Sequence, residues 1–328
     1  MTNGRQGALG PVGRAVKGLI CLSPRIRGLF EQRDQLLLER RQILEDFRVQ
    51  KQQLEERAVR ELEERAVRAE GHEVGMADSL ELQGDILNLL RHFTPRKAVG
   101  FDKVRVGRRG DGGYVLLDDF AGVETALSFG IEQECSWDTD LAARGVDIHM
   151  YDHTVDGPPA VHPRFRFFKK KISAAANEQS ETLGNILATI PALGNRILLK
   201  ADIEGSEWEM FEHSTIEDLS RIGQIVCEFH DFSRIADPVW RNRAIAVMSK
   251  LKSIFEVVHV HGNNNASLLS LANIPFPDVI EVTMVHKHYY NFEDELGIFP
   301  TNLDFPNYDK RPDIFMGNLR FPHGVPDA

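Results

Sequence analysis

Carboxylate and imidazole side chains stand two residues apart at the ends of two apolar runs. Asp202 and Glu204 follow the run 197–200, and Glu228 and His230 end the next run. Residues two apart in extended backbone share one face. Such a set could bind Mg²⁺ or Mn²⁺ through oxygen and nitrogen ligands, or one imidazole could act as a general base. The predicted metal ligands are Asp202, Glu204 and His230.

Two more histidines, His259 and His261, share a face in a later apolar run. His259 lies within a predicted strand, which favours a structural, hydrogen-bonded role. His261 lies at the end of that strand, which favours a functional role. The predicted catalytic residues are Asp202, Glu204, His230 and His261.

A single glycine and a later carboxylate suggest a nucleoside site. Gly130 ends the apolar run 125–129, and Asp152 follows the next run about twenty residues on. A carboxylate there can accept hydrogen bonds from both ribose hydroxyls, and glycine lets the backbone approach a ligand closely. Without a GxGxxG pattern, a plain strand-to-helix turn is an equal alternative. The predicted cofactor-binding residues are Ser128, Gly130, Asp152 and Asp202.

Strands and helices that alternate along the chain must position these side chains. The predicted strands are 125–129, 147–151, 165–168, 196–200, 224–229, 256–260 and 279–285, with helices over 135–144, 180–190, 207–219 and 239–255. The alternation predicts a mainly parallel sheet covered on both faces. The last two strands are joined by a predicted loop and not by a long helix, so one of them should be antiparallel. Two short strands, 104–106 and 114–117, are predicted around a glycine turn before the sheet, and the tail after Tyr289 is predicted to be loop-like. Ligands bind at the carboxyl ends of such strands.

The chain is predicted to consist of three parts: a basic tail over 1–28, a long helix or coiled coil over 29–78, and the main domain over 79–328. Residues 1–28 carry five basic residues and no acid, which predicts a flexible tail that could touch an anionic membrane surface. Apolar residues recur at spacings of three, four or seven over 29–70. They predict a long helix or imperfect coiled coil that could form a homo-oligomer, or else a lone charged helix. We expect a hinge at 71–78 and a helix over 80–93, so that the main domain spans 79–328.

Composition excludes several classes of protein. The formal net charge of −10 disfavours nucleic-acid binding, which needs clustered Lys and Arg. The three cysteines lack CxxC spacing, which argues against a disulfide framework or zinc cluster and fits a cytoplasmic location. No run reaches the roughly 18 apolar residues of a membrane span, and no signal-peptide pattern begins the chain.

Several blocks together resemble one enzyme family. The block 197–207, Ile-Leu-Leu-Lys-Ala-Asp-Ile-Glu-Gly-Ser-Glu, resembles the KxDxEGxE signature of FkbM-type methyltransferases. Gly-Asp-Gly-Gly-Tyr-Val at 110–115, Leu-Ser-Phe-Gly at 127–130 and Val-His-Val-His-Gly-Asn-Asn at 258–264 resemble other blocks of that family. The resemblance covers about residues 100–290.

The resemblance implies a Rossmann-like, seven-strand class I methyltransferase sheet, with S-adenosylmethionine as methyl donor and a sugar or polyketide hydroxyl as acceptor. Gly130 and Asp152 would contact the cofactor, and Asp202 and Glu204 would lie where cofactor and acceptor meet. Residues 128–132 carry one glycine where such enzymes usually have a glycine-rich loop. The resemblance therefore does not fix the cofactor contacts.

Two other functions compete with an O-methyltransferase acting on a glycan or small molecule. Asp202-Ile-Glu204 loosely matches the DxD metal motif of a nucleotide-sugar-dependent glycosyltransferase. Alternatively, the protein could be a non-enzymatic scaffold that acts through the helix over 29–70 and carries a degenerate methyltransferase domain.

Overall fold

The computed structural model describes residues 74–191 and 196–321. The predicted basic tail and nearly all of the predicted long helix lie outside these ranges and stay predictions. Helix α3 (Val74–Arg91) includes residues 74–78, so the hinge prediction is wrong there. Ile86 and Leu89 of α3 are fully buried, and this packing outweighs the cost of Gly75 near the helix start. No described helix combines the length and hydropathy that a bilayer crossing requires.

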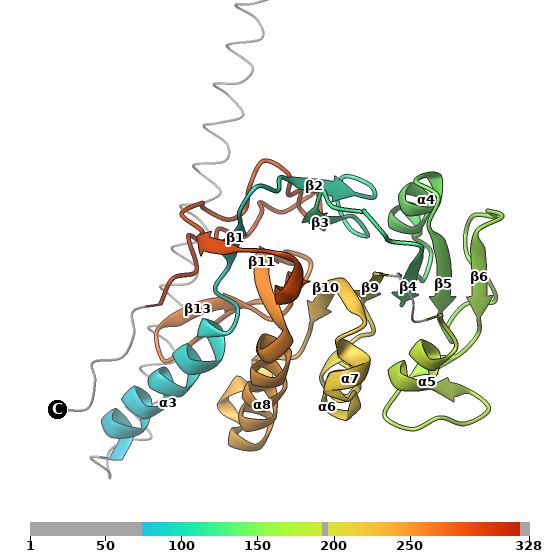
Figure 1. Cartoon of the computed structure of the whole chain (residues 1–328). Helices are drawn as coiled ribbons and strands as arrows, with labels where there is room; N and C mark the ends of the chain where they lie inside the picture. The colour runs from blue at the N-terminus through green and yellow to red at the C-terminus, as the bar shows by residue number, and fades with distance from the viewer. Residues whose placement is uncertain (1–73, 192–195, 322–328) are drawn as a thin grey trace, which may run out of the picture. The chain divides into compact units, whose positions relative to one another are not determined.

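A seven-stranded mixed sheet is the centre of this domain (Figure 1). In spatial order its strands are β6 (Phe165–Phe168), β5 (Asp147–Tyr151), β4 (Thr125–Phe129), β9 (Ile197–Ala201), β10 (Ile222–Phe229), β14 (Ile280–His286) and β11 (Phe255–Gly262). The first five pair in parallel, whereas β14 is antiparallel to both β10 and β11. Numbered along the chain, the order is 3-2-1-4-5-7-6. The predicted parallel sheet closed by an antiparallel pair is confirmed.

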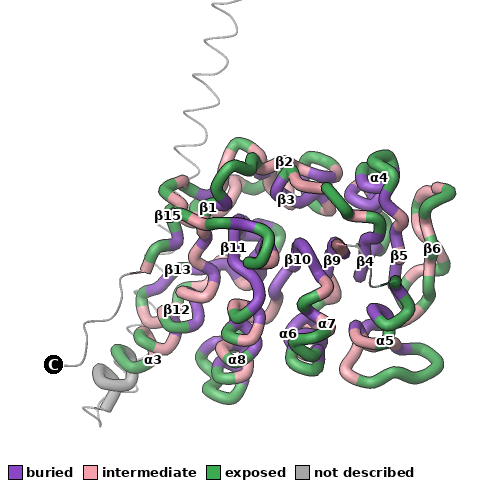
Figure 2. Tube along the Cα trace, viewed as in Figure 1, coloured by how far each residue is buried: buried purple, intermediate pink, exposed green. Residues whose placement is uncertain are grey.

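Helices cover one face of the sheet and bury its largest apolar cluster. They are α5 (Leu183–Ala188), α6 (Glu207–His213), α7 (Ile216–Leu219) and α8 (Pro238–Ile254). All eight residues of β10 are buried, as Figure 2 shows. Phe229 of β10 packs against Trp208 of α6, with ring centroids 4.7 Å apart, and Trp208 meets Trp240 of α8 at 5.3 Å. This apolar packing fixes the strand ends relative to the helices that follow them.

Two predicted helices are shorter in the structure because internal threonines act as N-caps. The predicted helix over 207–219 is broken between α6 and α7, where Thr215 and Asp218 form a reciprocal capping box. The predicted helix over 180–190 begins only at Leu183, since the Thr182 hydroxyl accepts the N–H of Asn185.

A hairpin covers the opposite face of the sheet at β10 and β14 (Figure 1). It consists of β2 (Lys103–Val106) and β3 (Tyr114–Leu117), the two short strands predicted around a glycine turn. The Gln224 side chain bonds both the N–H and the C=O of Leu117, at 3.1 and 3.2 Å. The Thr283 hydroxyl donates to the carbonyl of Val115. These polar contacts place Tyr114 over the carboxyl ends of the central strands.

Smaller elements complete the domain. They are α4 (Ser136–Ala143), the 3₁₀ turns η1 (Phe232–Ala236) and η2 (Lys287–Tyr289), and the strand pairs β1 (Arg96–Ala98) with β15 (Phe292–Asp294), β7 (Lys171–Ile172) with β8 (Ser180–Glu181), and β12 (Leu268–Leu271) with β13 (Ile274–Pro277). The pair β12–β13 lies in a region predicted as loop. Strand β15 likewise lies in the tail predicted as loop-like. It forms there because its residues pair with β1, which is far away in the sequence.

The C-terminal segment 299–317 is tied to the polar face of the sheet by buried side chains. His259 Nε2 donates to Asp304 Oδ1 at 2.7 Å, and Asp304 Oδ2 accepts the N–H of Thr301 at 2.6 Å. Although burial opposes its charge, these bonds and the two nearby histidines lower the pKa of Asp304 to about 2. Asn264 Nδ2 donates to the carbonyls of Tyr308 and Arg311, both at 3.0 Å. His259 therefore has a structural partner, as its position in the strand predicted.

We expect Asp304→Ala to lower the free energy of unfolding by about 1–3 kcal/mol, because it leaves buried His259 without its acceptor. Urea unfolding followed by circular dichroism measures the change. The exposed Asp309→Ala, five residues along, is the matched control and should shift stability by less than about 0.5 kcal/mol. Equal losses in the two variants would contradict a specific role for the His259–Asp304 bond.

Candidate functional site

The turn after β4 lies directly against the end of β9. Gly130 has φ +72°, and a Cβ atom added there would lie 1.7 Å from the backbone oxygen of Asp202. Lys200 Nζ donates to the carbonyl of Gly130 at 2.6 Å, and the Gly130 N–H donates to the carbonyl of Tyr151 at 3.0 Å. The ends of β4, β5 and β9 are thus held together at a point that only glycine fits.

Asp202 and Glu228 face each other at the ends of β9 and β10, with the Tyr114 hydroxyl between them. This hydroxyl donates to Glu228 Oε1 at 2.9 Å and lies 3.4 Å from Asp202 Oδ2. Glu228 Oε2 accepts from Asn263 Nδ2 at 3.0 Å. Glu228 is 3 % exposed, whereas the Asp202 side chain is 26 % exposed. Asp202 is therefore the carboxylate of this pair that a substrate can reach.

His230 lies beside this pair and is held by its Nδ1 atom. Nδ1 lies 3.2 Å from Oε1 of the fully buried Glu207 and 3.0 Å from the backbone oxygen of Glu228. Two acceptors at Nδ1 assign a proton to that atom. The other nitrogen, Nε2, points toward Asp202 Oδ1 at 3.9 Å and Glu204 Oε2 at 3.6 Å.

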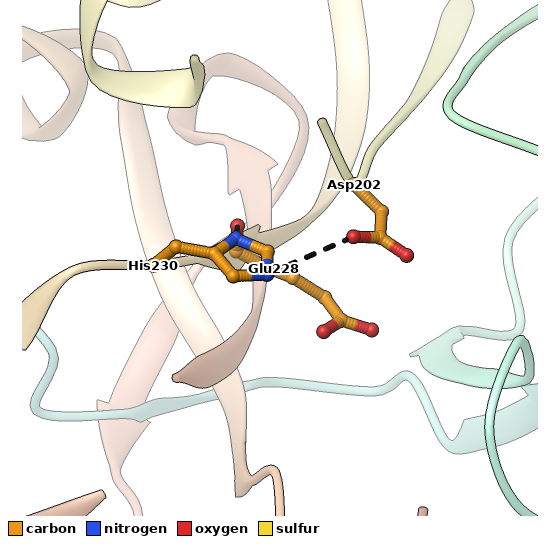
Figure 3. Close-up of side chains that lie close together, drawn as sticks. All are labelled: Asp202, Glu228 and His230. Carbon is orange, nitrogen blue, oxygen red and sulfur yellow. Dashed lines mark hydrogen bonds and ion pairs between the residues drawn. The ribbon is translucent and has the colours of Figure 1, made fainter. Parts of the chain in front are cut away.

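The side chains of Asp202, Glu228 and His230 converge on one space (Figure 3). One oxygen or nitrogen atom from each lies within 4.8 Å of the others. Glu204, which we predicted as the third ligand, has a side chain that is 87 % exposed and sits at the rim, on a residue with φ +53°. Glu228 from the neighbouring strand is the buried member of the cluster.

Burial and mutual repulsion shift the ionisation of the cluster. Burial raises the pKa of Asp202 to about 6, against the positive charges of Lys200 and His230. Burial also raises the pKa of Glu228 well above its usual range, and the nearby charge of Asp202 adds to the effect. Burial alone would lower the pKa of His230, but the hydrogen bond and charge of Glu207, with the charges of Asp202 and Glu228, raise it to about 10. The carboxylates of the cluster thus stabilise the positively charged form of His230 between them.

The predicted catalytic residue His261 lies apart from this cluster. Its Nδ1 is 3.0 Å from Glu281 Oε2 and its Nε2 is 2.9 Å from Asp313 Oδ1, and it is 1 % exposed. Burial would lower the pKa of His261, but the two flanking carboxylates raise it well above its usual range. His261 therefore links β11, β14 and the C-terminal segment, and its catalytic role stays a prediction.

Of the remaining predicted cofactor residues, Asp152 supports the Gly130 turn, whereas Ser128 lies buried within β4. Asp152 Oδ2 accepts the N–H groups of Ile131 and Glu132, both at 2.9 Å. Its Oδ1 accepts the N–H and hydroxyl of Thr154 at 2.7 and 2.6 Å. Although burial opposes it, these bonds lower the pKa of Asp152. Ser128 is fully buried, in register with Lys200. Ribose binding by Asp152 stays a prediction. It would require the two hydrogen bonds from Thr154 to Asp152 Oδ1 to break.

Besides Glu228, three residues of the site were not among the predicted site residues: Tyr114, Glu207 and Asn263. Tyr114 follows the glycine turn of the 110–115 block, and Asn263 follows His261 in the 258–264 block. Glu207 is the last residue of the 197–207 block. Each therefore stood in a block that the resemblance had already marked, but only the tertiary arrangement shows which side chains meet.

A cavity of about 330 Å³ lies elsewhere, lined in part by Ser173, Asn185, His213 and Asp218. These residues belong to the region of α5, α6 and α7, away from the carboxyl ends of β9 and β10. The cavity therefore does not include the converging side chains described above.

The chain matches no protein-family model and no curated protein sequence. Several solved structures are weakly similar. A chain of the fibrillarin/Nop5p complex is 11 % identical, with 50 % of this chain and 73 % of that chain covered and a TM-score of 0.30. A predicted O-methyltransferase, Atu636 from Agrobacterium tumefaciens, is 11 % identical, with coverage of 61 % and 80 % and a TM-score of 0.30. The bifunctional kinase-methyltransferase WbdD is 10 % identical, with coverage of 50 % and 35 % and a TM-score of 0.29.

Likenesses at these TM-scores carry no argument about function. The fold of this chain is instead defined by its own strand order and pairing. The membership in the FkbM-type family stays a prediction from the sequence blocks.

We expect Gly130→Ala to destabilise the domain more than Gly145→Ala does. Both positions have positive φ, at +72° and +93°, but a Cβ atom at Gly145 meets nothing within 4 Å. Backbone strain should cost each variant about 1–2 kcal/mol, and only Gly130→Ala adds the clash with Asp202. Urea unfolding measures both. Equal losses would show that the close approach of β4 and β9 does not constrain the site.

Proposed function

We propose that the chain is an S-adenosylmethionine-dependent O-methyltransferase with its site at the carboxyl ends of β4, β9 and β10. The observation that carries this proposal is the meeting of Gly130, Asp202 and His230 where the strand order 3-2-1-4-5-7-6 reverses. Open α/β sheets bind their ligands at such reversal points. The KxDxEGxE block lies at the same point and supports the proposal independently.

The residues present fit a nucleoside-type donor at this position. The Gly130 turn lacks a side chain, and the partly exposed Asp202 and the exposed Glu204 lie beside it. We propose that this turn, with Asp202, holds the donor, while Asp152 keeps the turn in shape through the N–H groups of Ile131 and Glu132. Carboxylates also favour the positively charged sulfur of the donor.

S-adenosylmethionine supplies a methyl group on a sulfonium when it is bound. Methyl transfer forms an O–CH₃ bond on the acceptor and breaks the S–CH₃ bond, so the acceptor hydroxyl must lose its proton. Asp202 and Glu204 are the carboxylates at the site that solvent reaches, and we propose that they orient the hydroxyl and receive this proton. His230, fixed by Glu207, orients Asp202 from the buried side.

We propose a sugar or other polyhydroxylated molecule as the acceptor, as the family resemblance implies. Several carboxylates that can accept hydrogen bonds from hydroxyl groups at one site support this class of acceptor. A nucleotide-sugar enzyme would use the same carboxylates differently, and the ligand experiment below separates the two.

We expect S-adenosylhomocysteine to stabilise the full-length protein, because a ligand that binds only the native state raises its stability by RT ln(1 + [L]/Kd). At a hundredfold excess over Kd the gain is about 2.7 kcal/mol, which should raise Tm by several degrees. Differential scanning fluorimetry with S-adenosylhomocysteine, UDP-sugars and adenosine measures it. A shift with UDP-sugars alone would favour a glycosyltransferase, and no shift at millimolar S-adenosylhomocysteine would reject the proposed donor.

We expect Asp202→Ala to lower methyl transfer by at least about a hundredfold, the scale at which positioned acid–base groups contribute. Release of S-adenosylhomocysteine with a panel of sugars as acceptors measures the rate. The exposed Glu217→Gln on α7 is the control and should keep full activity. A folded Asp202→Ala protein with near-normal turnover would show that the site is assigned to the wrong strand end.

A further inference from the structure

We infer that Asp202, Glu228 and His230 bind one divalent cation, which in turn holds the hydroxyl oxygen of the acceptor. The role on the acceptor rests on the proposed function, whereas the binding of the cation does not. The inference goes beyond the metal set predicted from sequence, because it replaces the rim residue Glu204 by the buried Glu228 from β10.

The spacing of the three side chains matches ligands rather than hydrogen-bond partners. His230 Nε2 and Asp202 Oδ1 are 3.9 Å apart, which is too long for a hydrogen bond. Ligand atoms about 2.1 Å from an octahedral cation are separated by about 3.0 Å when adjacent and about 4.2 Å when opposite. The three groups lie within 4.8 Å of one another. Side-chain shifts of about an ångström would therefore be needed to bring all three onto one ion.

Each buried ligand has an outer partner that fixes its orientation. The Nδ1 proton of His230 faces Glu207, so a cation would take the place of the proton that the imidazolium carries on Nε2 and release that proton to solvent. Tyr114 and Asn263 each donate to one oxygen of Glu228, at 2.9 and 3.0 Å. Metal-binding histidines and carboxylates are characteristically oriented by such outer hydrogen bonds.

Unbalanced negative charge is the second observation that points to a cation. Four carboxylates surround His230: those of Asp202, Glu204, Glu207 and Glu228. Glu207 is fully buried, its Oε1 contacts His230, and its Oε2 has no hydrogen-bond partner among the described residues. Ionised carboxylates are costly to bury without a compensating charge. The His230 imidazolium supplies one positive charge, and a divalent ion in place of its Nε2 proton would supply two.

The neighbouring His261 is a buried histidine with no ring nitrogen available to a cation. It also lies between two carboxylates, but both of its ring nitrogens have partners at 3.0 and 2.9 Å. No ring nitrogen is left for an ion there. His230 differs because its Nε2 faces a gap, so His261 is a matched control for the proposed site.

Two oxygen ligands with one imidazole suit Mn²⁺, and Mg²⁺ would bind more weakly because it prefers oxygen alone. An ion bound by three protein ligands keeps open positions for water or for an acceptor hydroxyl. Binding would make that hydroxyl more acidic, in the way that bound cations acidify water. With Asp202 bound to the ion, Glu204 at the rim is the carboxylate that receives the proton.

Titration of Mn²⁺ into the full chain, followed by electron paramagnetic resonance, tests the inference without any methyl donor. We expect one saturable site, with nitrogen coupling from an imidazole in the echo-modulation spectrum. In His230→Gln the coupling should vanish. In His230→Gln and Glu228→Gln the affinity should fall at least about tenfold, whereas His261→Gln should bind as the wild type does. Circular dichroism of each variant checks that it is folded.

Absence of saturable Mn²⁺ binding to the wild type would overturn the inference. Equal affinity in the wild type and His230→Gln would also overturn it. If a variant is unfolded, the wild-type echo-modulation spectrum decides alone, since a bound ion without nitrogen coupling excludes His230. Mn²⁺ binding without any response to S-adenosylhomocysteine would keep the cation site and reject the methyltransferase, and the reverse result would reject only the cation.

Discussion

The crowding of carboxylates at the ends of β9 and β10 is the constraint on which this site depends. Asp202 and Glu228 offer oxygens within 4.8 Å of one another, in a place that is mostly closed to solvent. Two like charges at that separation repel by about 3 kcal/mol at an effective dielectric constant of 20. The domain tolerates them because the Tyr114 hydroxyl and Asn263 donate hydrogen bonds to Glu228, and His230 places a positive charge beside Asp202. A site built in this way is prepared to receive a cation or a proton.

The sheet explains how these groups meet although they are far apart in the chain. Its strand order places the end of β4 beside that of β9, and β9 beside β10, so that Gly130, Asp202 and Glu228 become neighbours. The helices bury one face with apolar rings, whereas the other face combines a second apolar cluster with buried polar side chains such as Gln224, Glu228 and Thr283. The β2–β3 hairpin and the segment 299–317 then cover the polar face through Tyr114, Asp304 and Asp313. The site is thus enclosed by segments from both ends of the domain.

Much of this arrangement follows from the sequence, because strands and parallel pairing leave strong apolar patterns. All seven strands of the sheet and the convergence of Asp202 with His230 could be predicted from runs and their end residues. The partners of His261 could not, since Glu281 and Asp313 are distant in sequence and the segment 299–317 has no periodic pattern. Spacing in the sequence does not show that Glu204 has a positive φ and an exposed side chain, or that Glu228 is the buried carboxylate beside Asp202. The N-caps Thr182 and Thr215 could not be predicted either, because both threonines lie within continuous helical patterns in the sequence.

The central claim is that a methyl donor binds over the turn at Gly130 and the end of β9. Ultraviolet cross-linking of tritiated S-adenosylmethionine, followed by peptide mapping, tests it most directly. We expect label within residues 128–134 or 200–207, and loss of that label when excess S-adenosylhomocysteine competes. Label confined to the peptides that line the cavity near α5 and α6, or label that S-adenosylhomocysteine does not displace, would contradict it.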